Sequence, residues 1–405
     1  MRSLMAGALA ISASFMVVFP LLPSLQDRAN ISTAQLGWIA TAGFVAALVA
    51  QTLIAPHADR GRERLVINGA IITMAVSTLM YAVGDSIHWF IAGRIGAGLA
   101  YGAFTPAAIG LIVRRFPDAP GRQIGRLQSI ELGGMAIGPV LAVAGKVAFG
   151  VVPTLVIASV LTVAVGLPAL LAKPAVISSL PIGTVRPPES HGSFTDGVRL
   201  LRHRSVLAAA MIMTAFFIPI GAYDALFPRF LADIGSNDWL IGAALMAFAV
   251  PSMFLASWAG RQVDRLGPFR AAARGGAANI AVIVSYGFVR VPMVVVIIGL
   301  FESGGQTIVG AAGAAAMGWA VPGRRAATAQ GIGEALATVA AALVAAMAAP
   351  LYAAGGATAL FVTTAALTAA ALTGGVRLGR AATPVEARIT VPVAPSSRRH
   401  VPAMA

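Results

Sequence analysis

The sequence predicts an all-α membrane protein in which twelve transmembrane helices form two homologous six-helix bundles. Three observations lead to this fold class: the apolar composition, a series of apolar segments of spanning length, and a repeat that relates the two halves of the chain. Of the 405 residues, 58% are hydrophobic and 11% are charged, whereas soluble proteins carry about 45–50% apolar and about 25% charged residues. This composition excludes a cytosolic enzyme, a secreted domain and a disordered protein. Membrane enzymes, receptors, channels and transporters remain.

The cysteine count and the distribution of charge narrow the function further. The chain has no cysteine, which excludes disulfides, thiolate metal sites and cysteine nucleophiles. Its 29 basic and 15 acidic residues give a net charge of +14, a value that could suggest nucleic-acid binding. The basic residues instead occur in short clusters between apolar stretches, which is the pattern of membrane topology signals. We therefore expect no nucleic-acid partner.

The predicted spans follow from helix length, because about 20 apolar residues are needed to cross the hydrocarbon core. Charged and Pro/Gly clusters divide the chain into twelve segments of that order, near residues 4–25, 34–56, 65–84, 88–113, 126–147, 152–172, 206–230, 239–260, 270–289, 292–318, 327–350 and 356–376. The first segment resembles a signal peptide at its start. Its uninterrupted apolar run through Leu25 and the eleven spans that follow predict a first transmembrane helix instead.

The distribution of Lys and Arg predicts the orientation and the domains. With the N-terminus inside, 24 of the 29 basic residues fall on one side of the membrane and 5 on the other. Because cytoplasmic loops carry the basic excess, we expect a multi-pass protein of the plasma (inner) membrane with both termini in the cytoplasm. Residues 1–172 form the N-terminal bundle and residues 206–380 the C-terminal bundle. A cytoplasmic linker, 173–205, ending in a short interfacial helix joins them, and 381–405 form a disordered tail.

An internal repeat relates the two predicted bundles. At an offset of 205 residues, Pro23 matches Pro228, Gly37 matches Gly242, and Asp59-Arg60 matches Asp264-Arg265. At an offset of 202, Gly121-Arg122 matches Gly323-Arg324 and Gln128 matches Gln330. Two homologous halves predict a midplane site that opens to either side as one half rocks against the other. The repeat therefore favours a transporter over an enzyme or a receptor.

The loop after the eighth span carries a family resemblance. Its sequence, GRQVDRLGPFR, resembles the G-x-x-x-D-R-x-G-x-x-R signature of the major facilitator superfamily, with the matching residues Gly260, Asp264, Arg265, Gly267 and Arg270. The loop after the second span keeps Asp59-Arg60, but has Ala55 for the leading Gly and lacks one residue before Gly61. The resemblance implies a cytoplasmic gate, in which a carboxylate beside a helix N-terminus and its Arg partners hold helix ends together in one state.

Two further resemblances lie in the fourth and fifth spans. Gly134, Gly138 and Pro139 are similar to the G-x-x-x-G-P core of the superfamily's antiporter signature, which favours an exporter. The alternative is generic small-residue packing between helices, with a proline kink. Arg94 with Gly98 resembles the family's R-x-x-x-G pattern. Together the resemblance extends over roughly residues 1–380.

Four acids fall inside predicted spans, where each costs about 2.5–3.5 kcal/mol to insert and is therefore a functional candidate. Glu302 lies about ten residues into its helix, hence about 15 Å deep. Burial favours the neutral form of a carboxyl, so that it can exchange a proton near neutral pH. We rank Glu302 first as the proton-coupling residue, then Glu334, Asp224 and Glu131. The alternative is a carboxyl that only holds helices together, and Arg126 or a neighbouring basic loop could neutralise Glu131.

Arg94 is the basic residue placed most clearly within a span. It is expected to pair with one of these acids or to contact an anionic substrate group, and the alternative is that it snorkels outward to the interface. In the family that the chain resembles, the same spans line the cavity. Candidate walls are therefore the aromatic residues Phe15, Phe19, Phe44, Tyr101, Phe216, Phe217, Tyr223, Phe248, Trp258 and Phe301. The alternative for each is a lipid-facing or packing aromatic.

No hydrolytic, metal or nucleotide motif is present in the sequence, and neither lysine, Lys146 or Lys173, belongs to a Walker run. We therefore expect no enzyme activity, no cofactor and no metal. The leading hypothesis is a monomeric secondary transporter that exports drugs or metabolites in exchange for protons. Its partners would be a small-molecule substrate, protons and the lipid bilayer. The alternatives are an uptake symporter or facilitator for sugars or organic acids and, more remotely, a membrane sensor or a lipid-handling membrane enzyme.

Overall fold

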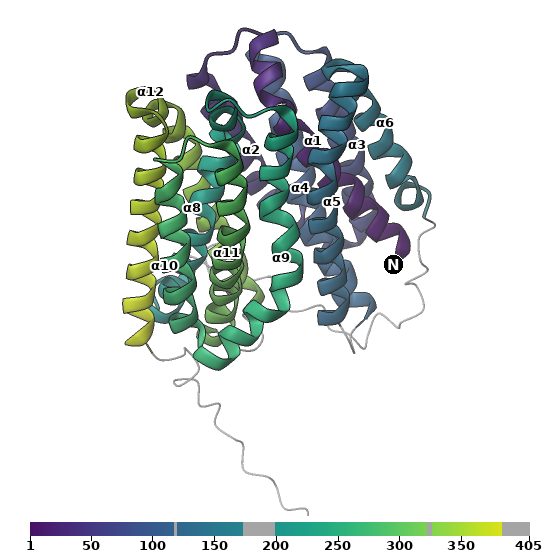
Figure 1. Ribbon diagram of the computed structural model, residues 1–405. Coiled ribbons are helices and arrows are strands. Elements are labelled where there is room, and N and C mark those ends of the chain that lie inside the picture. Colours follow the sequence, from purple (N-terminus) through teal and green to yellow (C-terminus); the bar gives the residue numbers. More distant parts are fainter. Residues whose placement is uncertain (117–119, 173–198, 322–325, 383–405) are drawn as a thin grey trace, which may run out of the picture.

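The computed structural model describes residues 1–116, 120–172, 199–321 and 326–382. This part is built of long helices (Figure 1). The helices are α1 (Arg2–Arg28), α2 (Thr33–Val49), η1 (Ala50–Ile54), η2 (Ala58–Arg62), α3 (Glu63–Val83), α4 (Ile87–Arg115), α5 (Pro120–Phe149), α6 (Val151–Leu170), α8 (Arg204–Asp233), α9 (Asp238–Leu266), α10 (Pro268–Tyr286), α11 (Pro292–Ala320) and α12 (Ala326–Arg380). Most of the predicted linker and nearly all of the predicted tail lie outside the described residues.

The lengths of these helices suit a membrane. Within the described residues, ten helical segments are long and apolar enough to cross a bilayer. One of them, Ala329–Arg380, has 52 residues, and α12 breaks at Gly355 and Gly356, where the backbone leaves helical geometry. This break falls between the predicted eleventh and twelfth spans. The shorter helix α10 has 19 residues and carries Arg270 and Arg274 in its first two turns. The total of twelve crossings stays a prediction.

The internal repeat is confirmed by the helix boundaries. Helices α4 and α11 each have 29 residues, and both their first and last residues are 205 positions apart. Helices α2 and α9 begin 205 positions apart, and so do α3 and α10. Two units of the same helical plan therefore follow one another along the chain.

The two halves, α1–α6 and α8–α12, meet through equivalent helices. Contacts between the halves are made by α2 against α12 and by α5 against α9. A Cβ atom on Gly37 of α2 would lie 2.7 Å from the carbonyl oxygen of Ala345 on α12. A Cβ atom on its repeat partner, Gly242 of α9, would lie 3.0 Å from Val143 on α5. The interface is therefore pseudosymmetric, with a glycine at the same place in each half.

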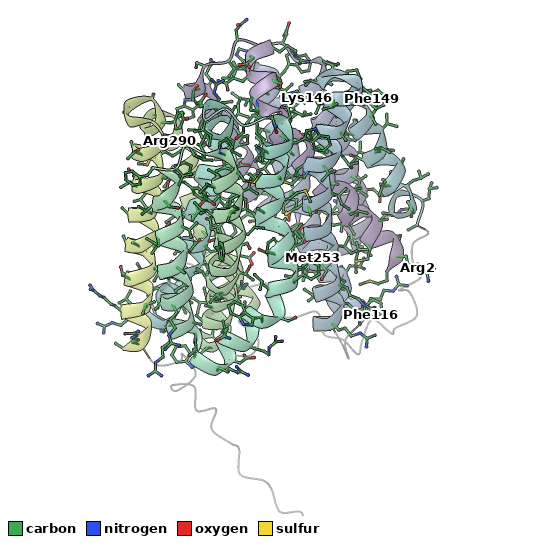
Figure 2. The ribbon with its side chains drawn as sticks, viewed as in Figure 1. Arg2, Phe116, Lys146, Phe149, Met253 and Arg290 are labelled. Atoms are coloured by element: carbon green, nitrogen blue, oxygen red, sulfur yellow. The ribbon has the colours of Figure 1, made fainter. Side chains whose placement is uncertain are left out.

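Polar contacts between the halves gather at one end of the bundle. Lys146 Nζ donates to Asp238 Oδ1 over 2.5 Å, and Arg229 lies 3.5 Å from Asp27. Figure 2 shows Lys146 near the top of the molecule and Arg2 and Phe116 lower down. We name the two ends the Lys146 end and the Arg2 end. The ribbons of α5 and α9 lie close at the top of Figure 1 and diverge toward the bottom. The halves are therefore joined at the Lys146 end.

The two signature loops are mostly helical, which corrects the expected loop boundaries. Helix α9 continues to Leu266, and the chain after α2 passes through the π-helical segments η1 and η2. Hydropathy marks only the lipid-buried part of a helix, whereas its hydrogen bonds continue into water. Each copy has a glycine with positive φ shortly before the next helix. Gly61, with φ +81°, lies within η2 two residues before α3, and Gly267, with φ +75°, directly follows α9. Glycine adopts this conformation without steric cost.

The small residues of the fifth span lie where α5 packs on α1. A Cβ atom on Gly134 would lie 2.8 Å from the Ser12 Cβ, and one on Gly138 would lie 2.6 Å from the Ala13 carbonyl oxygen. No larger side chain fits at either position without moving α1. Close helix packing is therefore confirmed for this motif, and α5 remains helical through Pro139. Its link to antiport stays a prediction.

Candidate functional site

Glu302 lies at the centre of the C-terminal half, where three helices present groups to it. Its side chain on α11 is 1% exposed. Tyr223 on α8 donates its hydroxyl to Oε1, and Tyr286 on α10 donates to Oε2 over 2.7 Å. Each carboxylate oxygen therefore accepts one tyrosine hydrogen bond. Two hydroxyl donors, one to each oxygen, are the arrangement that stabilises a deprotonated carboxylate.

The surroundings of this carboxyl are aromatic. Tyr286 lies 5.5 Å from both the Phe227 and the Phe361 rings, and the Tyr223 ring lies 5.3 Å from that of Phe248. Within the described part of the chain, Glu302 makes no ion pair. A buried charge without a counter-charge is expensive, and a carboxyl relieves that cost by binding a proton. The rings therefore create the desolvated setting that the depth of Glu302 predicted.

The two tyrosines differ in accessibility. Tyr286 is fully buried, whereas Tyr223 is half-buried. Of the three side chains that make this cluster, only Tyr223 is partly exposed.

A second polar centre joins the two halves. The Arg94 guanidinium on α4 contacts both carboxylate oxygens of Asp224 on α8, and the two side chains are 8% and 6% exposed. The guanidinium also lies 4.7 Å from the Phe15 ring centroid and 4.9 Å from that of Phe19, a cation–π arrangement. Arg94 therefore pairs with one of the predicted acids, and the alternative that it snorkels to the interface is wrong.

Helix α8 carries one member of each centre at adjacent positions. Tyr223 points to Glu302 within its own half, and Asp224 points to Arg94 in the other half. Consecutive helical residues are about 100° apart around the axis, which makes this division possible. Pro219 and Pro228 lie on either side of the pair within α8. A small rotation of this segment would change both contacts together.

The remaining two acids have different settings. Glu131 is 7% exposed and accepts a hydrogen bond from Thr105 over 2.9 Å, while Arg126 donates to Gln123 rather than to Glu131. The proposed neutralisation by Arg126 is therefore wrong in this arrangement. Glu334 on α12 is exposed and accepts from Gln330 over 3.2 Å.

The exposure of Glu334 shows where the halves part. Ala341 and Ala345 lie on the same face of α12, two and three turns farther from its start, and both are buried. Ala345 lies against Gly37 of α2, in the other half. The face that the N-terminal half covers toward the Lys146 end is thus uncovered at Glu334.

The predicted wall aromatics separate into distinct places. Phe15 and Phe19 hold Arg94, and the Tyr101 ring lies 5.3 Å from Phe15. Phe216 and Phe217 lie edge to face, 5.5 Å apart, within the C-terminal half. Phe301 is 74% exposed, on a different face of α11 from the buried Glu302. It therefore does not belong to either polar centre.

The predicted gate residues lie at the Arg2 end. Asp264, Arg265 and Arg270 are exposed, and they form no ion pair within the described residues. Gly260 lies inside α9, with nothing within 4 Å of the position of a Cβ atom. The side chains of Asp59 and Arg60 lie outside the described part of the structure.

Sequence reasoning missed Tyr286. A signal was available, because the chain has only five tyrosines and Tyr286 matches Tyr81 at the repeat offset of 205. A tyrosine retained in both halves at the same depth points to a buried polar role in at least one of them. The cross-half pairing of Lys146 with Asp238 was also missed, since Lys146 was predicted only to lie at the interface.

Comparison with known proteins supports the family resemblance. A model of the Major Facilitator Superfamily matches residues 4–312. The chain belongs to the Major Facilitator Superfamily. It is therefore an integral membrane protein of a transporter family, and the predicted major facilitator fold is confirmed.

Individual relatives match over shorter stretches. The chain is 27% identical to the uncharacterized MFS-type transporter YwfA of Bacillus subtilis over 28% of either chain. It is 28% identical to the lincomycin resistance protein of Streptomyces lincolnensis, over 33% of this chain and 28% of that protein. It is 25% identical to the quinolone resistance protein NorA of Staphylococcus aureus, over 30% of this chain and 32% of NorA. The chain thus spans about a third of the length of these relatives.

Among solved structures, a similar one is a bacterial homologue of the human lysosomal transporter Spinster, in an inward-facing and unoccupied conformation. It aligns with a TM-score of 0.74 and 14% identity, over 93% of this chain and 96% of that chain. The same homologue in an inward-facing and occupied conformation aligns with a TM-score of 0.73. At this identity the likeness shows the fold alone.

Proposed function

We propose that this transporter exports small cationic molecules in exchange for protons, with Glu302 as the proton carrier. The observation that carries the proposal is the Glu302 carboxyl, 1% exposed, held by two tyrosine hydroxyls and without a counter-charge among the described residues. Such a group is suited to bind and release a proton, because burial opposes its charged form while the two hydroxyls stabilise that form.

The hydrogen-bond pattern suits the deprotonated form. Each tyrosine hydroxyl has one hydrogen, and both can be donated only if neither Glu302 oxygen carries a proton. When a proton arrives, the carboxyl becomes a donor and one tyrosine loses its acceptor. Tyr223, the half-buried one, is free to turn its hydroxyl away from Glu302. Protonation therefore loosens α8 at Tyr223 and leaves the fully buried Tyr286 in place.

Loosening at Tyr223 acts on the contact between the halves. Asp224 is the next residue of α8, and its pairing with Arg94 holds the halves together toward the Lys146 end. Substrate that binds from the cytoplasm would be carried to the outward-open state. There a proton that binds Glu302 from outside would keep the Arg94–Asp224 pair apart while the substrate leaves. The protonated carrier would return, lose its proton to the cytoplasm and restore the pair, so that substrate and proton cross in opposite directions, which is antiport by alternating access.

The charges at membrane depth favour a cationic substrate. Arg94 is neutralised by Asp224, which leaves Glu131, Glu302 and Glu334 as net negative groups. Glu334 is the exposed one of these acids, so it would attract the substrate while Glu302 carries the proton. The names of two relatives, which refer to lincomycin and quinolone resistance, support export of drug-like molecules.

The basic clusters favour an orientation with the Arg2 end and both termini in the cytoplasm of a plasma-membrane protein. In that orientation the structure is closed to the outside. Asp264, Arg265 and Arg270, which form no ion pair here within the described residues, would then engage as a cytoplasmic gate in the opposite state. The gate would be open in the arrangement that accepts substrate from inside.

The test is proton movement in liposomes that contain the purified protein and an internal pH dye. Cationic drugs, neutral sugars and organic acids would be added in turn, and we expect a substrate-dependent pH change with cations only. Glu302→Gln should abolish it, whereas the exposed Asp85→Asn should not. Tracer flux without proton movement in the unchanged protein would contradict proton coupling, and a response to sugars or organic acids would contradict the substrate class.

A further inference from the structure

A groove of about 340 Å³ lies in the N-terminal half, away from both polar centres. It is bordered by η1 and η2, by α3 and by α4. Its walls are mostly apolar and include Leu65, Gly69, Leu99 and Ala103, while Arg62 and His57 lie at its Arg2 end. Its volume lies within the range of about 300–1,000 Å³ that small-molecule sites occupy.

The groove opens away from the partner half. On α4, Tyr101 faces Phe15 of α1, and Arg94 faces Asp224. Leu99 and Ala103 are each two residues from Tyr101, hence about 200° around the helix from it. Leu65, at the rim, is 68% exposed. The surroundings of this face are therefore the lipid tails of the bilayer rather than the space between the halves.

The length of the groove corresponds to one leaflet. Along α3, its lining extends from Arg62 to Thr73, eleven residues and so about 16 Å of helix. The hydrocarbon core is about 30 Å thick, so one leaflet contributes about half of that depth. An acyl chain that starts at Arg62 would end near the bilayer midplane.

The charge distribution along the groove is also that of a lipid site. Arg62 is exposed and His57 half-buried, and neither forms an ion pair within the described residues. Beyond them toward Thr73 the lining is apolar. Basic groups at the cytoplasmic surface attract anionic headgroups, and basic pockets between helices on that side bind them.

We propose that this groove binds one phospholipid of the cytoplasmic leaflet that has an anionic headgroup, with the headgroup at Arg62 and an acyl chain along Gly69 toward Thr73. The proposal depends on the orientation inferred from the basic clusters and is independent of the role of Glu302. A lipid held there contacts η2, which carries the first copy of the signature loop, and stabilises η2 against α4.

Glycine 69 provides a sharp test of the acyl-chain part. Nothing lies within 4 Å of a Cβ atom at Gly69, so Gly69→Leu fits the fold while its side chain fills the groove. Gly318 on α11 is also exposed and unobstructed, which makes Gly318→Leu the matched control. Arg62→Gln tests the headgroup part. Its control is Arg274→Gln, because Arg274 is also exposed and lies near the start of α10.

The readout is the number of phosphatidylglycerol molecules that remain on the full-length protein in native mass spectrometry, together with the thermal shift that added phosphatidylglycerol produces. We expect one retained lipid in the unchanged protein and in both controls. Gly69→Leu should lose it, and Arg62→Gln should bind it about fivefold more weakly, the effect of one basic contact to an anionic headgroup.

Three results would overturn the proposal. In the first, Gly69→Leu retains as much phosphatidylglycerol as Gly318→Leu does. In the second, the unchanged protein binds phosphatidylcholine as well as phosphatidylglycerol. The third is a thermal shift with inorganic phosphate as large as that with phosphatidylglycerol, which would indicate an anion site without a lipid. Thermal unfolding of each variant without added lipid shows whether it is folded before the comparison is made.

Discussion

The two halves of the molecule share a scaffold and differ in chemistry. Tyr286 in α10 donates to Glu302, whereas its repeat partner Tyr81 in α3 stacks on Phe90 with ring centroids 5.5 Å apart. The position that matches Glu302 at the offset of 205 is Ala97, which is buried among apolar residues. One copy of the repeated unit therefore carries an ionisable group at its centre, and the other carries a methyl group.

The two halves also direct their buried charges differently. The N-terminal half contributes a positively charged residue, Arg94, which pairs with Asp224 of the other half. The C-terminal half keeps its acid, Glu302, among its own helices. Arg94 in this arrangement joins the halves, while Glu302 is suited to sense protons. Tyr223 and Asp224, adjacent on α8, connect the two tasks.

The largest effect is expected from breaking the pair between the halves. Either Arg94→Gln or Asp224→Asn leaves one charged side chain buried without its partner, a cost of about 3–5 kcal/mol. The apparent melting temperature in detergent should fall sharply for each single variant. The double variant should recover most of the loss, because no unpaired charge remains. If the melting temperature of the double variant fell by the sum of the two single losses, the ion pair would not explain the instability of the single variants.

A smaller effect should separate the two tyrosines. Tyr223→Phe and Tyr286→Phe each remove one hydrogen bond from Glu302 and keep the ring. We expect Tyr223→Phe to slow substrate-driven proton movement about tenfold or more, since a hydrogen bond to a charged group contributes about 1.5–3 kcal/mol and Tyr223 also connects Glu302 to the neighbouring Asp224 on α8. Tyr286→Phe should retain most of the rate.

The measurement for this pair is the initial rate of dye response in liposomes at matched protein content. Equal slowing in both variants would mean that the hydrogen bonds only stabilise Glu302. A greater loss of rate in Tyr286→Phe than in Tyr223→Phe would contradict the role given to Tyr223 in connecting Glu302 to Asp224.

The smallest effect should distinguish the two interface glycines. Gly37→Ala would place its methyl group 2.7 Å from a backbone oxygen of Ala345, which cannot turn aside. Gly242→Ala would meet the Val143 side chain at 3.0 Å, which can shift. Overpacking of the first kind costs about 1–3 kcal/mol, and we expect less for Gly242→Ala. Thermal unfolding measures the difference, and a larger loss for Gly242→Ala would contradict the interface described.

Much of the helical scaffold could be predicted from the sequence, because the positions of the helices follow from local rules. Apolar length located the helices, and the offset of 205 anticipated that α4 and α11 would begin and end at equivalent residues. The ends of the helices were harder to predict, because α9 continues to Leu266 beyond its apolar part. Depth along a helix was sufficient to rank Glu302 first among the acids.

The partners of the charged groups could not be predicted from the sequence in the same way. Glu302 meets Tyr223 and Tyr286 only because three helices converge, and no pattern within one helix determines that. Arg94 could have reached the interface by snorkelling, and only the assembly of the two halves brings it to Asp224. Phe301 shows the same limit: it is adjacent to Glu302 in sequence but lies on the exposed face of α11.

The most direct test of the account compares two kinds of transport in liposomes that contain the Glu302→Gln variant. With a cationic substrate on both sides, the variant should exchange labelled for unlabelled substrate as the unchanged protein does. With an imposed pH gradient, the unchanged protein should accumulate substrate and the variant should not. Accumulation by Glu302→Gln at the normal level would contradict the assignment of Glu302 as the proton carrier.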